Sequence, residues 1–329
     1  MADLDDLLTK TSRTFALSIP LLPEPTRRQV TLGYLLFRIA DTFEDAATWS
    51  NAKRVAALHD FCRLLTGDRP HDDTESLAAT WSAEVPIDHE GYQELLRETP
   101  FVLDAFFELD PTARELVRSH VTRTAEGMAD YVERTDEQGE LQLRDLDDLR
   151  EYCYIVAGIV GEMLTELFLL GRDELSPVAD DLRSRARRCG EAQQLVNILK
   201  DSAFDATEGR SYLAGAQRAE VFDLARRDLD TAAEYILLLQ RSKTERGLIA
   251  FNALPVLLAF AALDRVEEAG PGSKVSRDEL FAIMEKLEND LDDDRPVVFL
   301  RRQNRQEPTR QGVNGSSPGS PPSRVGGSR

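Results

Sequence analysis

The chain has 329 residues, of which 42% are hydrophobic, and this is enough apolar material for one large helical domain or two smaller domains. Its formal net charge of −19 excludes nucleic acid as an expected partner, because binding to a phosphate backbone needs clustered lysine and arginine. Six lysines accompany thirty-four arginines. This scarcity of lysine in an acidic chain favours a high-salt cytoplasm that screens self-repulsion, with an arginine-rich, acidic proteome as the alternative.

Helical periodicity dominates the sequence, which shows no alternating strand runs, no internal repeat and no dinucleotide-binding glycine motif. Residues 1–11 are typical of a short amphipathic segment, and residues 12–24, with two prolines, of an extended flap. The linker 67–87 is left without a predicted helix. Helices are expected over 25–45, 51–66, 88–108, 111–134, 144–172, 177–207, 216–240, 243–267 and 276–293. The sequence therefore predicts an all-α fold: one domain over 1–302, built as a compact bundle around one central cavity.

The longest apolar run, residues 247–263, is broken by Asn252 and Pro255, so we expect a buried core helix rather than a membrane span. Residues 303–329 are rich in Ser, Gly, Pro and Arg and are expected to form a disordered polar tail. The first residues are acidic, and the three cysteines are widely spaced, which favours a cytoplasmic protein without a disulfide framework. Contact with a membrane is expected to be peripheral, and the oligomeric state is left open.

Two acidic motifs carry most of the functional information. Asp41 and Asp45 stand at i and i+4, and Asp201 and Asp205 repeat that spacing about 160 residues later. On a helix, this spacing places both carboxylates on one face, where they repel each other unless a cation neutralises them. Two such faces turned toward each other would form an oxygen-rich cage suited to Mg²⁺. The alternative for either pair is a solvated acidic face.

The residues around each motif favour the buried interpretation. Tyr34 and Arg38 precede Asp41 at helical spacing, on a segment whose other residues are largely apolar. A buried arginine and two buried aspartates are costly without partners. The second motif lies on a comparable polar stripe that includes Asn197, and it ends at a Gly-Arg pair in which Arg210 is a candidate phosphate ligand.

Five motifs, in this order and spacing, resemble the squalene and phytoene synthase family across roughly residues 8 to 295. They are residues 12–16, 34–45, 127–129 with 152–161, 194–213 and 251–255. The resemblance implies an isoprenoid synthase type of helical bundle. It also implies head-to-head (1′-1) condensation of two farnesyl diphosphates through a cyclopropyl diphosphate intermediate.

The Asp-Thr-Phe-Glu-Asp and Phe-Asn-Ala-Leu-Pro stretches are closer to squalene synthases, which add a reduction by NADPH that yields squalene. A phytoene or dehydrosqualene synthase, which lacks the reductive step, is the alternative. A catalytically silent scaffold relative is less favoured, because all four aspartates are present.

The resemblance also assigns roles to individual residues. The metal ligands implied are Asp41, Glu44, Asp45, Asp201 and Asp205. The substrate contacts are Arg13, Thr14, Phe15, Arg38, Asn197, Lys200 and Arg210, and the catalytic residues are Tyr34, Arg38 and Tyr152. Lys274, on a Gly-Pro-Gly-Ser loop, is a candidate contact for NADPH or for the diphosphate, with a flexible surface lysine as the alternative.

The glycine pair Gly158 and Gly161, and Tyr152, can each be explained either by structure or by function. Gly158 and Gly161 lie within a predicted helix, where each costs about 1 kcal/mol relative to Ala. They indicate either close helix packing or a cavity wall kept small for a prenyl chain. Tyr152 is either a core tyrosine with a satisfied hydroxyl or a polar group placed over the reacting centre.

Overall fold

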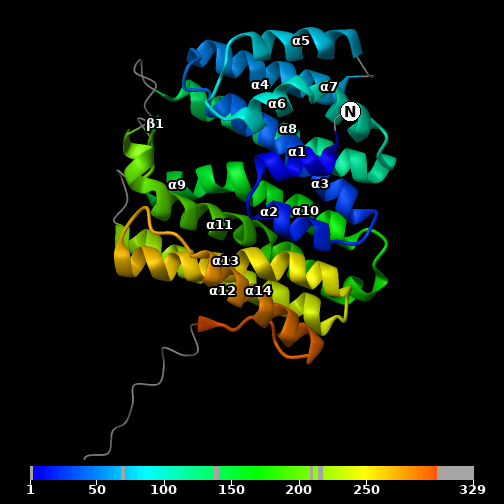
Figure 1. Ribbon diagram of the computed structural model, residues 1–329, viewed down its shortest axis with the longest axis vertical. Coiled ribbons are helices and arrows are strands. Elements are labelled where there is room, and N and C mark those ends of the chain that lie inside the picture. Colours follow the sequence, from blue (N-terminus) through cyan, green and yellow to red (C-terminus); the bar gives the residue numbers. More distant parts are fainter. Residues whose placement is uncertain (1–2, 68–70, 136–140, 208–209, 214–217, 302–329) are drawn as a thin grey trace, which may run out of the picture. The chain divides into compact units, whose positions relative to one another are not determined.

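The computed structural model describes residues 3–67, 71–135, 141–207, 210–213 and 218–301. These residues belong almost entirely to one unit, Met1–Phe299, which is shown in Figure 1. The predicted tail over 303–329 lies outside the described residues. Most of the described chain is helical, as predicted.

The helices follow the predicted ranges closely. They are α1 (Leu4–Thr11), α2 (Phe15–Ser18), α3 (Thr26–Glu44), α4 (Asn51–Thr66), α5 (His71–Ala83), α6 (Glu90–Arg97), α7 (Thr99–Phe107), α8 (Pro111–Glu133), α9 (Leu146–Cys153), α10 (Ile159–Leu169), α11 (Ala179–Thr207), α12 (Arg218–Arg241), α13 (Arg246–Ala269) and α14 (Arg277–Asp292). Three shorter elements complete the set, namely η1 (Ile19–Leu21), η2 (Tyr154–Gly158) and η3 (Asp173–Val178).

The prediction of an extended flap over 12–24 is wrong, because α2 and η1 occupy most of it. The Ser12 hydroxyl accepts a hydrogen bond from the Phe15 backbone N–H at 2.9 Å, just before this short helix, whose N-cap residue is Thr14. The predicted helix over 88–108 divides at Glu98 into α6 and α7. Pro100 stands in the first turn of α7, a position that tolerates its missing N–H.

Two other features were not predicted. The linker 67–87 contains α5, and two short strands, β1 (Leu141–Gln142) and β2 (Arg210–Ser211), form a parallel pair. That pair joins the residues before α9 to the end of the second acidic motif. The strands have two residues each, too short for an alternating pattern to be recognised in sequence.

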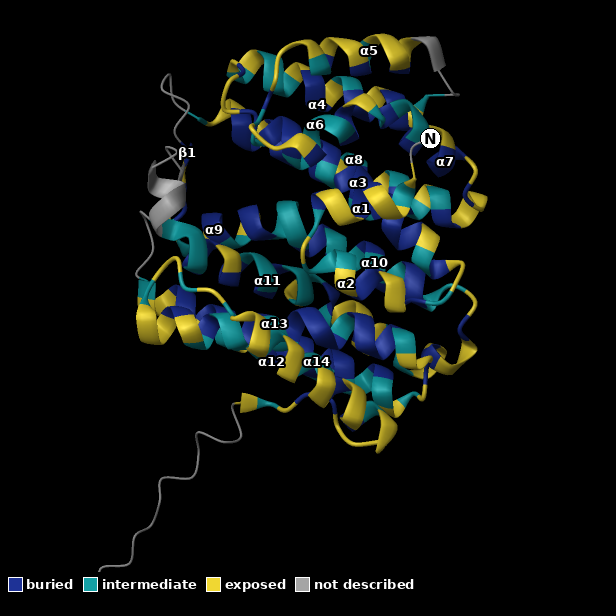
Figure 2. Ribbon diagram, in the orientation of Figure 1, coloured by how far each residue is buried: buried dark blue, intermediate teal, exposed yellow. Residues whose placement is uncertain are grey.

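The core is built around α3, which packs against α4, α6, α7, α8 and α10. Leu32, Leu35 and Leu36 on this helix are fully buried. Figure 2 shows the buried residues that run along α3 and α13. Figure 1 places α4 and α5 at one end of the main unit and α12, α13 and α14 at the other.

Two helical segments are long and apolar enough to cross a membrane: Leu146–Leu169 and Arg246–Ala269. Within the protein, 50% and 61% of their most apolar windows are buried, which is what helices in a protein core show. The second segment is α13, which continues through Pro255. It is the buried core helix that the sequence predicts for residues 247–263.

Glycines permit a very close approach between α11 and the segment formed by η2 and α10. A Cβ atom on Gly190 would collide with the carbonyl oxygen of Ala157, and one on Gly161 would collide with that of Ala186. Both obstacles are backbone atoms, which cannot rotate away. Gly161 also lines the cavity, so both the packing and the cavity-wall interpretations apply to it.

Candidate active site

A cavity of about 240 Å³ lies between α3, η2, α10, α11, α12 and α13, with α2 and η1 also contributing residues. Most of the lining is apolar and includes Phe15, Ile19, Val30, Phe37, Val160, Leu164, Phe251 and Val256. The polar residues from α3 and α11 are Tyr34, Arg38, Asp41, Gln193, Gln194 and Asn197. The cavity therefore suits a ligand with an apolar body and an anionic group.

The lining changes in character along α3. Val30 lies near the start of the helix, whereas Asp41 lies about 16 Å further along the axis. Tyr34 and Arg38 stand between them, each one turn from the next. One helix thus presents an apolar, then an aromatic, then a charged surface to the same cavity.

Arg38 and Asp41 form an ion pair, with 3.2 Å between Nη1 and Oδ2 and side chains that are 24% and 27% exposed. Burial raises the pKa of the Asp41 carboxyl to about 6, against the opposing effect of Arg38 and with a further increase from Asp45. Burial opposes the charge of Arg38, but Asp41 and the neighbouring tyrosines hold its pKa above its usual value. A cation close to Asp41 would relieve the cost of ionising this buried carboxyl.

The substrate contacts predicted near the start of the chain are Arg13, Thr14 and Phe15, and they differ in exposure and in whether they line the cavity. Phe15 lines the cavity, and its ring centroid lies 5.6 Å from that of Tyr34. Thr14 is partly buried and Arg13 is exposed. The Tyr34 hydroxyl donates to the Thr11 carbonyl at 2.7 Å, which fixes the ring beside Arg38.

The second acidic motif belongs to α11. Asn197 lines the cavity, and its side-chain oxygen accepts a hydrogen bond from Lys200 Nζ at 3.1 Å. Lys200 also pairs with Asp201 at 3.2 Å, and Asp201 lies one turn beyond Asn197 on the same helix. The motif thus reaches the cavity through Asn197, and Lys200 links Asn197 to Asp201. The side chains of Asp205 and Arg210 lie outside the described residues.

The loop that carries Lys274 lies against α11. The backbone N–H of Gly272 donates to the carbonyl of Lys200 at 2.7 Å, and Lys274 itself is exposed. The structure thus brings this loop to the second acidic motif, although about 70 residues separate the two in the sequence. Nothing in the spacing of the motifs indicated this contact.

Tyr152 lies beside the first acidic motif and is not among the residues that line the cavity. Its hydroxyl donates to Glu44 at 3.2 Å and lies 3.1 Å from the hydroxyl of Tyr212. The rings of Tyr131 and Tyr212 pack against it with centroids 5.1 and 5.0 Å away. Tyr152 is 3% exposed, so its hydroxyl is buried and satisfied, and its catalytic role stays a prediction.

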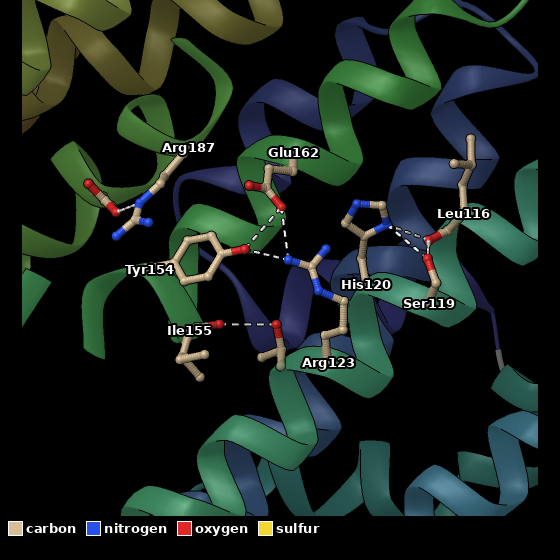
Figure 3. A network of polar contacts seen from close by, with 10 residues as sticks. Leu116, Ser119, His120, Arg123, Tyr154, Ile155, Glu162 and Arg187 are labelled. Atoms are coloured by element: carbon tan, nitrogen blue, oxygen red, sulfur yellow. Dashed lines mark hydrogen bonds and ion pairs between the residues drawn. The ribbon is translucent and has the colours of Figure 1, made fainter. Parts of the chain in front are cut away.

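A polar network supports η2 on the side of Tyr154 (Figure 3). Arg123 donates to the Tyr154 hydroxyl and pairs with Glu162 at 3.1 Å, while Arg187 lies 4.1 Å from the centre of the Tyr154 ring. Thr124 donates to the Ile155 carbonyl at 3.0 Å. The next two residues of η2 line the cavity. The network therefore anchors a wall of the cavity from behind.

Sequence comparison identifies the family. Residues 8–216, more than half of the chain, match the profile described as squalene/phytoene synthase. The chain belongs to this family. The prediction made from the five motifs is thus confirmed at the level of the family.

Individual relatives agree with this membership. The chain is 33% identical to the squalene synthase of Eremothecium gossypii over 207 residues, which cover 63% of the chain and 44% of that protein. It is 26% identical to the squalene synthase of Schizosaccharomyces pombe over 280 residues, covering 79% of the chain and 58% of that protein. The chain thus spans about half the length of the curated relatives it matches.

Solved structures confirm the fold. A complex of TcSQS with the ligand BPH1237 matches with a TM-score of 0.68 at 22% identity, covering 94% of this chain and 92% of that one. A dehydrosqualene synthase in complex with a ligand matches with a TM-score of 0.55 at 21% identity, covering 88% and 95%. The all-α, isoprenoid synthase type of fold predicted from the sequence is therefore correct.

The side-chain oxygen atoms of Asp41 and Asn197 are of the kind that binds a hard divalent cation. Among the residues whose side chains the structure describes, no three His, Cys, Asp or Glu side chains converge closely enough to hold a metal ion by themselves. The cavity nevertheless combines the Asp41 carboxylate with the Asn197 amide. Oxygen donors of this kind, completed by water and substrate phosphate, are what Mg²⁺ prefers.

Tyr92 and Gln193 are two residues of the site that were not predicted from the sequence. Tyr92, on α6, lies with its ring centre 5.1 Å from the Arg38 guanidinium carbon. Gln193 lines the cavity with a buried amide nitrogen that has no hydrogen-bond partner among the described residues. Neither belongs to an acidic or arginine motif, so no pattern in the sequence marked them.

Proposed function

We propose that the protein is a squalene synthase: it condenses two farnesyl diphosphates head to head and reduces the product with NADPH. The observation that carries this proposal is the mainly apolar cavity in which Arg38, Asp41 and Asn197 meet from two helices. The curated relatives described above are squalene synthases, which favours this product over phytoene or dehydrosqualene.

The first task of such a site is to stabilise the leaving diphosphate. Mg²⁺, when bound, supplies positive charge to the diphosphate oxygens, and the residues proposed to hold it are Asp41, Glu44, Asp45, Asp201 and Asp205. Arg38 donates to the same diphosphate from within the cavity. Further donors come from Arg13, Thr14, Lys200 and Arg210. This set of charges favours departure of pyrophosphate, because negative charge develops there in the transition state.

The second task is to protect the allylic cation from water. Phe15, Tyr34 and Phe251 line the cavity, and the faces of aromatic rings attract cations. The double bond of the second farnesyl diphosphate attacks the cation, and loss of a proton closes a cyclopropyl diphosphate. Ionisation of that intermediate releases a second pyrophosphate and leaves a rearranged cation. NADPH, when bound, would supply the hydride that converts that cation to squalene.

Lys274 is the proposed contact for the phosphates of NADPH. Its loop is attached to Lys200 through the Gly272 N–H, and an exposed ammonium there can reach a ligand that approaches from solvent. Because farnesyl diphosphate and squalene are lipids, we also propose a cytoplasmic enzyme that contacts membranes peripherally.

The product identifies the reaction. The purified protein is incubated with farnesyl diphosphate and Mg²⁺, with and without NADPH, and the lipids are identified by mass spectrometry. We expect squalene with NADPH, and the cyclopropyl diphosphate or its rearranged alcohols without it. The same hydrocarbon under both conditions would indicate a dehydrosqualene synthase. Consumption of geranylgeranyl diphosphate alone would indicate a phytoene synthase, and no consumption a silent relative.

A further inference from the structure

The Arg38 guanidinium lies between two tyrosine rings that come from different helices. Its central carbon is 5.7 Å from the ring centre of Tyr34 on α3 and 5.1 Å from that of Tyr92 on α6. Arg38 also pairs with Asp41 and interacts with the Tyr34 hydroxyl. The Nε atom is buried and has no hydrogen-bond partner among the described residues. Two tyrosines and one carboxylate thus lie around this charge.

The helices that carry the two rings both pack against α1, and the Tyr92 ring itself stacks on His89 with centroids 3.9 Å apart. The carbonyl of Thr11 accepts the hydrogen bond of the Tyr34 hydroxyl. The carbonyl of the preceding residue, Lys10, lies so close to Gly91 that a Cβ atom there would collide with it. Lys10 Nζ also pairs with Glu94 on α6 at 2.8 Å. Two consecutive residues of α1 therefore fix the positions of the two helices that carry Tyr34 and Tyr92.

This arrangement suits an arginine that must bind an anion. A guanidinium is planar and carries its N–H donors in the plane, whereas cation–π contacts use its face. The Tyr92 ring can therefore orient the group without occupying the donors that a diphosphate needs. A second carboxylate in place of Tyr92 would compete with the ligand for those donors and add negative charge beside Asp41.

We propose that Tyr92 is a positioning residue: with Tyr34 it orients the Arg38 guanidinium toward the cavity, so that its N–H donors are available to a diphosphate. The proposal rests on the proposed function, which supplies the ligand. Tyr92 acts through Arg38 and need not contact the substrate. Because this role needs only the aromatic face of the side chain, Tyr92→Phe is expected to keep it and Tyr92→Leu is expected to lose it.

The test measures binding of inorganic pyrophosphate with Mg²⁺ to the full chain by titration calorimetry. Tyr92→Phe is expected to bind within about twofold of the wild type. Tyr92→Leu is expected to bind about tenfold more weakly, at the upper end of what a partly desolvated cation–π contact contributes. Tyr92→Met is a second variant without an aromatic face, for use if the leucine variant does not fold.

Phe222→Leu is the matched control, since it removes an aromatic face from another arginine, Arg226, and Phe222 is not among the cavity-lining residues. It is expected to lower the melting temperature and leave pyrophosphate affinity within about twofold. A double-mutant cycle with Arg38→Gln completes the design. In that background, Tyr92→Leu is expected to cause no further loss.

Equal affinities of the wild type and Tyr92→Leu would overturn the positioning role while leaving the proposed function intact. So would a tenfold loss that persists in the Arg38→Gln background, because Tyr92 would then act independently of Arg38. A wild-type protein that binds no pyrophosphate would overturn the proposed function and, with it, the role of Tyr92.

Discussion

The Tyr152 hydroxyl donates a hydrogen bond to the Glu44 carboxylate at 3.2 Å, across 108 residues of sequence. Glu44 is the last residue of α3 and lies within the first acidic motif. Burial, followed by the charge of Glu44, raises the pKa of Tyr152 well above its usual value, so the phenol stays protonated and donates. This contact couples α9 to the end of α3, where the proposed metal ligands lie.

Tyr152→Phe is therefore expected to lower the free energy of unfolding by about 2 kcal/mol, because a carboxylate in a buried environment loses a donor. Turnover is expected to fall further than this destabilisation explains, by about 100-fold, if Tyr152 also acts on the substrate. Urea denaturation and steady-state kinetics give the two values. Tyr212→Phe is the control, since it removes the other hydroxyl near Tyr152 and leaves the Glu44 contact intact.

Asp41→Asn and Asp201→Asn are each expected to lower turnover by about 100-fold or more, because each removes a carboxylate from the proposed charge clamp. Activity of the wild type is expected to disappear on chelation by EDTA and to return with Mg²⁺. Asp180→Asn, at the exposed start of α11, should leave turnover unchanged. Near wild-type turnover in either test variant would show that these aspartates hold no metal.

Asp228 is expected to make the protein less stable as the pH rises. Burial, and then the charge of Glu191, raises its pKa to about 6, whereas Arg150, Arg188 and Arg227 act in the opposite direction. Between about pH 4 and pH 6 the folded protein therefore holds a proton that the unfolded chain has released. The contribution of this carboxyl to the free energy of unfolding is greatest below that window and falls across it, by about 3 kcal/mol at most.

Asp228→Asn should accordingly be more stable than the wild type at pH 8 and should lose this part of the pH dependence. Urea denaturation at pH 4.5, 6 and 8 measures it. A variant with the same pH profile as the wild type would show that Asp228 ionises normally in the folded protein.

Gly190→Ala is expected to destabilise the protein by about 3 kcal/mol or more, since its Cβ would collide with the backbone carbonyl of Ala157. Gly33→Ala is the matched control, because the atom in its way is the mobile end of the Met163 side chain. Its cost is expected to stay below about 1 kcal/mol. Thermal unfolding compares the two, and equal losses would contradict the backbone collision.

Site residues could be predicted from the sequence where they all lie on one face of one helix. The face formed by Tyr34, Arg38 and Asp41 follows from helical spacing, and all three residues line the cavity. Contacts between residues that are distant in the sequence could not be predicted. The position of Tyr92 over Arg38 depends on how α1 packs against α6, and the contact of Gly272 with Lys200 depends on how a loop folds back onto α11. Such pairings are properties of the packed bundle.

The backbone contact between Gly190 and Ala157 has a consequence for how this cavity can change. The distance between η2 and α11 is set by main-chain atoms at Ala157 and Gly190, and nearly every substitution at Gly190 would disturb it. Substitutions among the side chains that line the cavity leave this distance unchanged. Val156, Val160 and Leu164 can then be varied in size to shorten or lengthen the interior while the helices stay in register. Under the proposed function, selectivity for the length of the prenyl chain becomes a property that can be altered separately from folding.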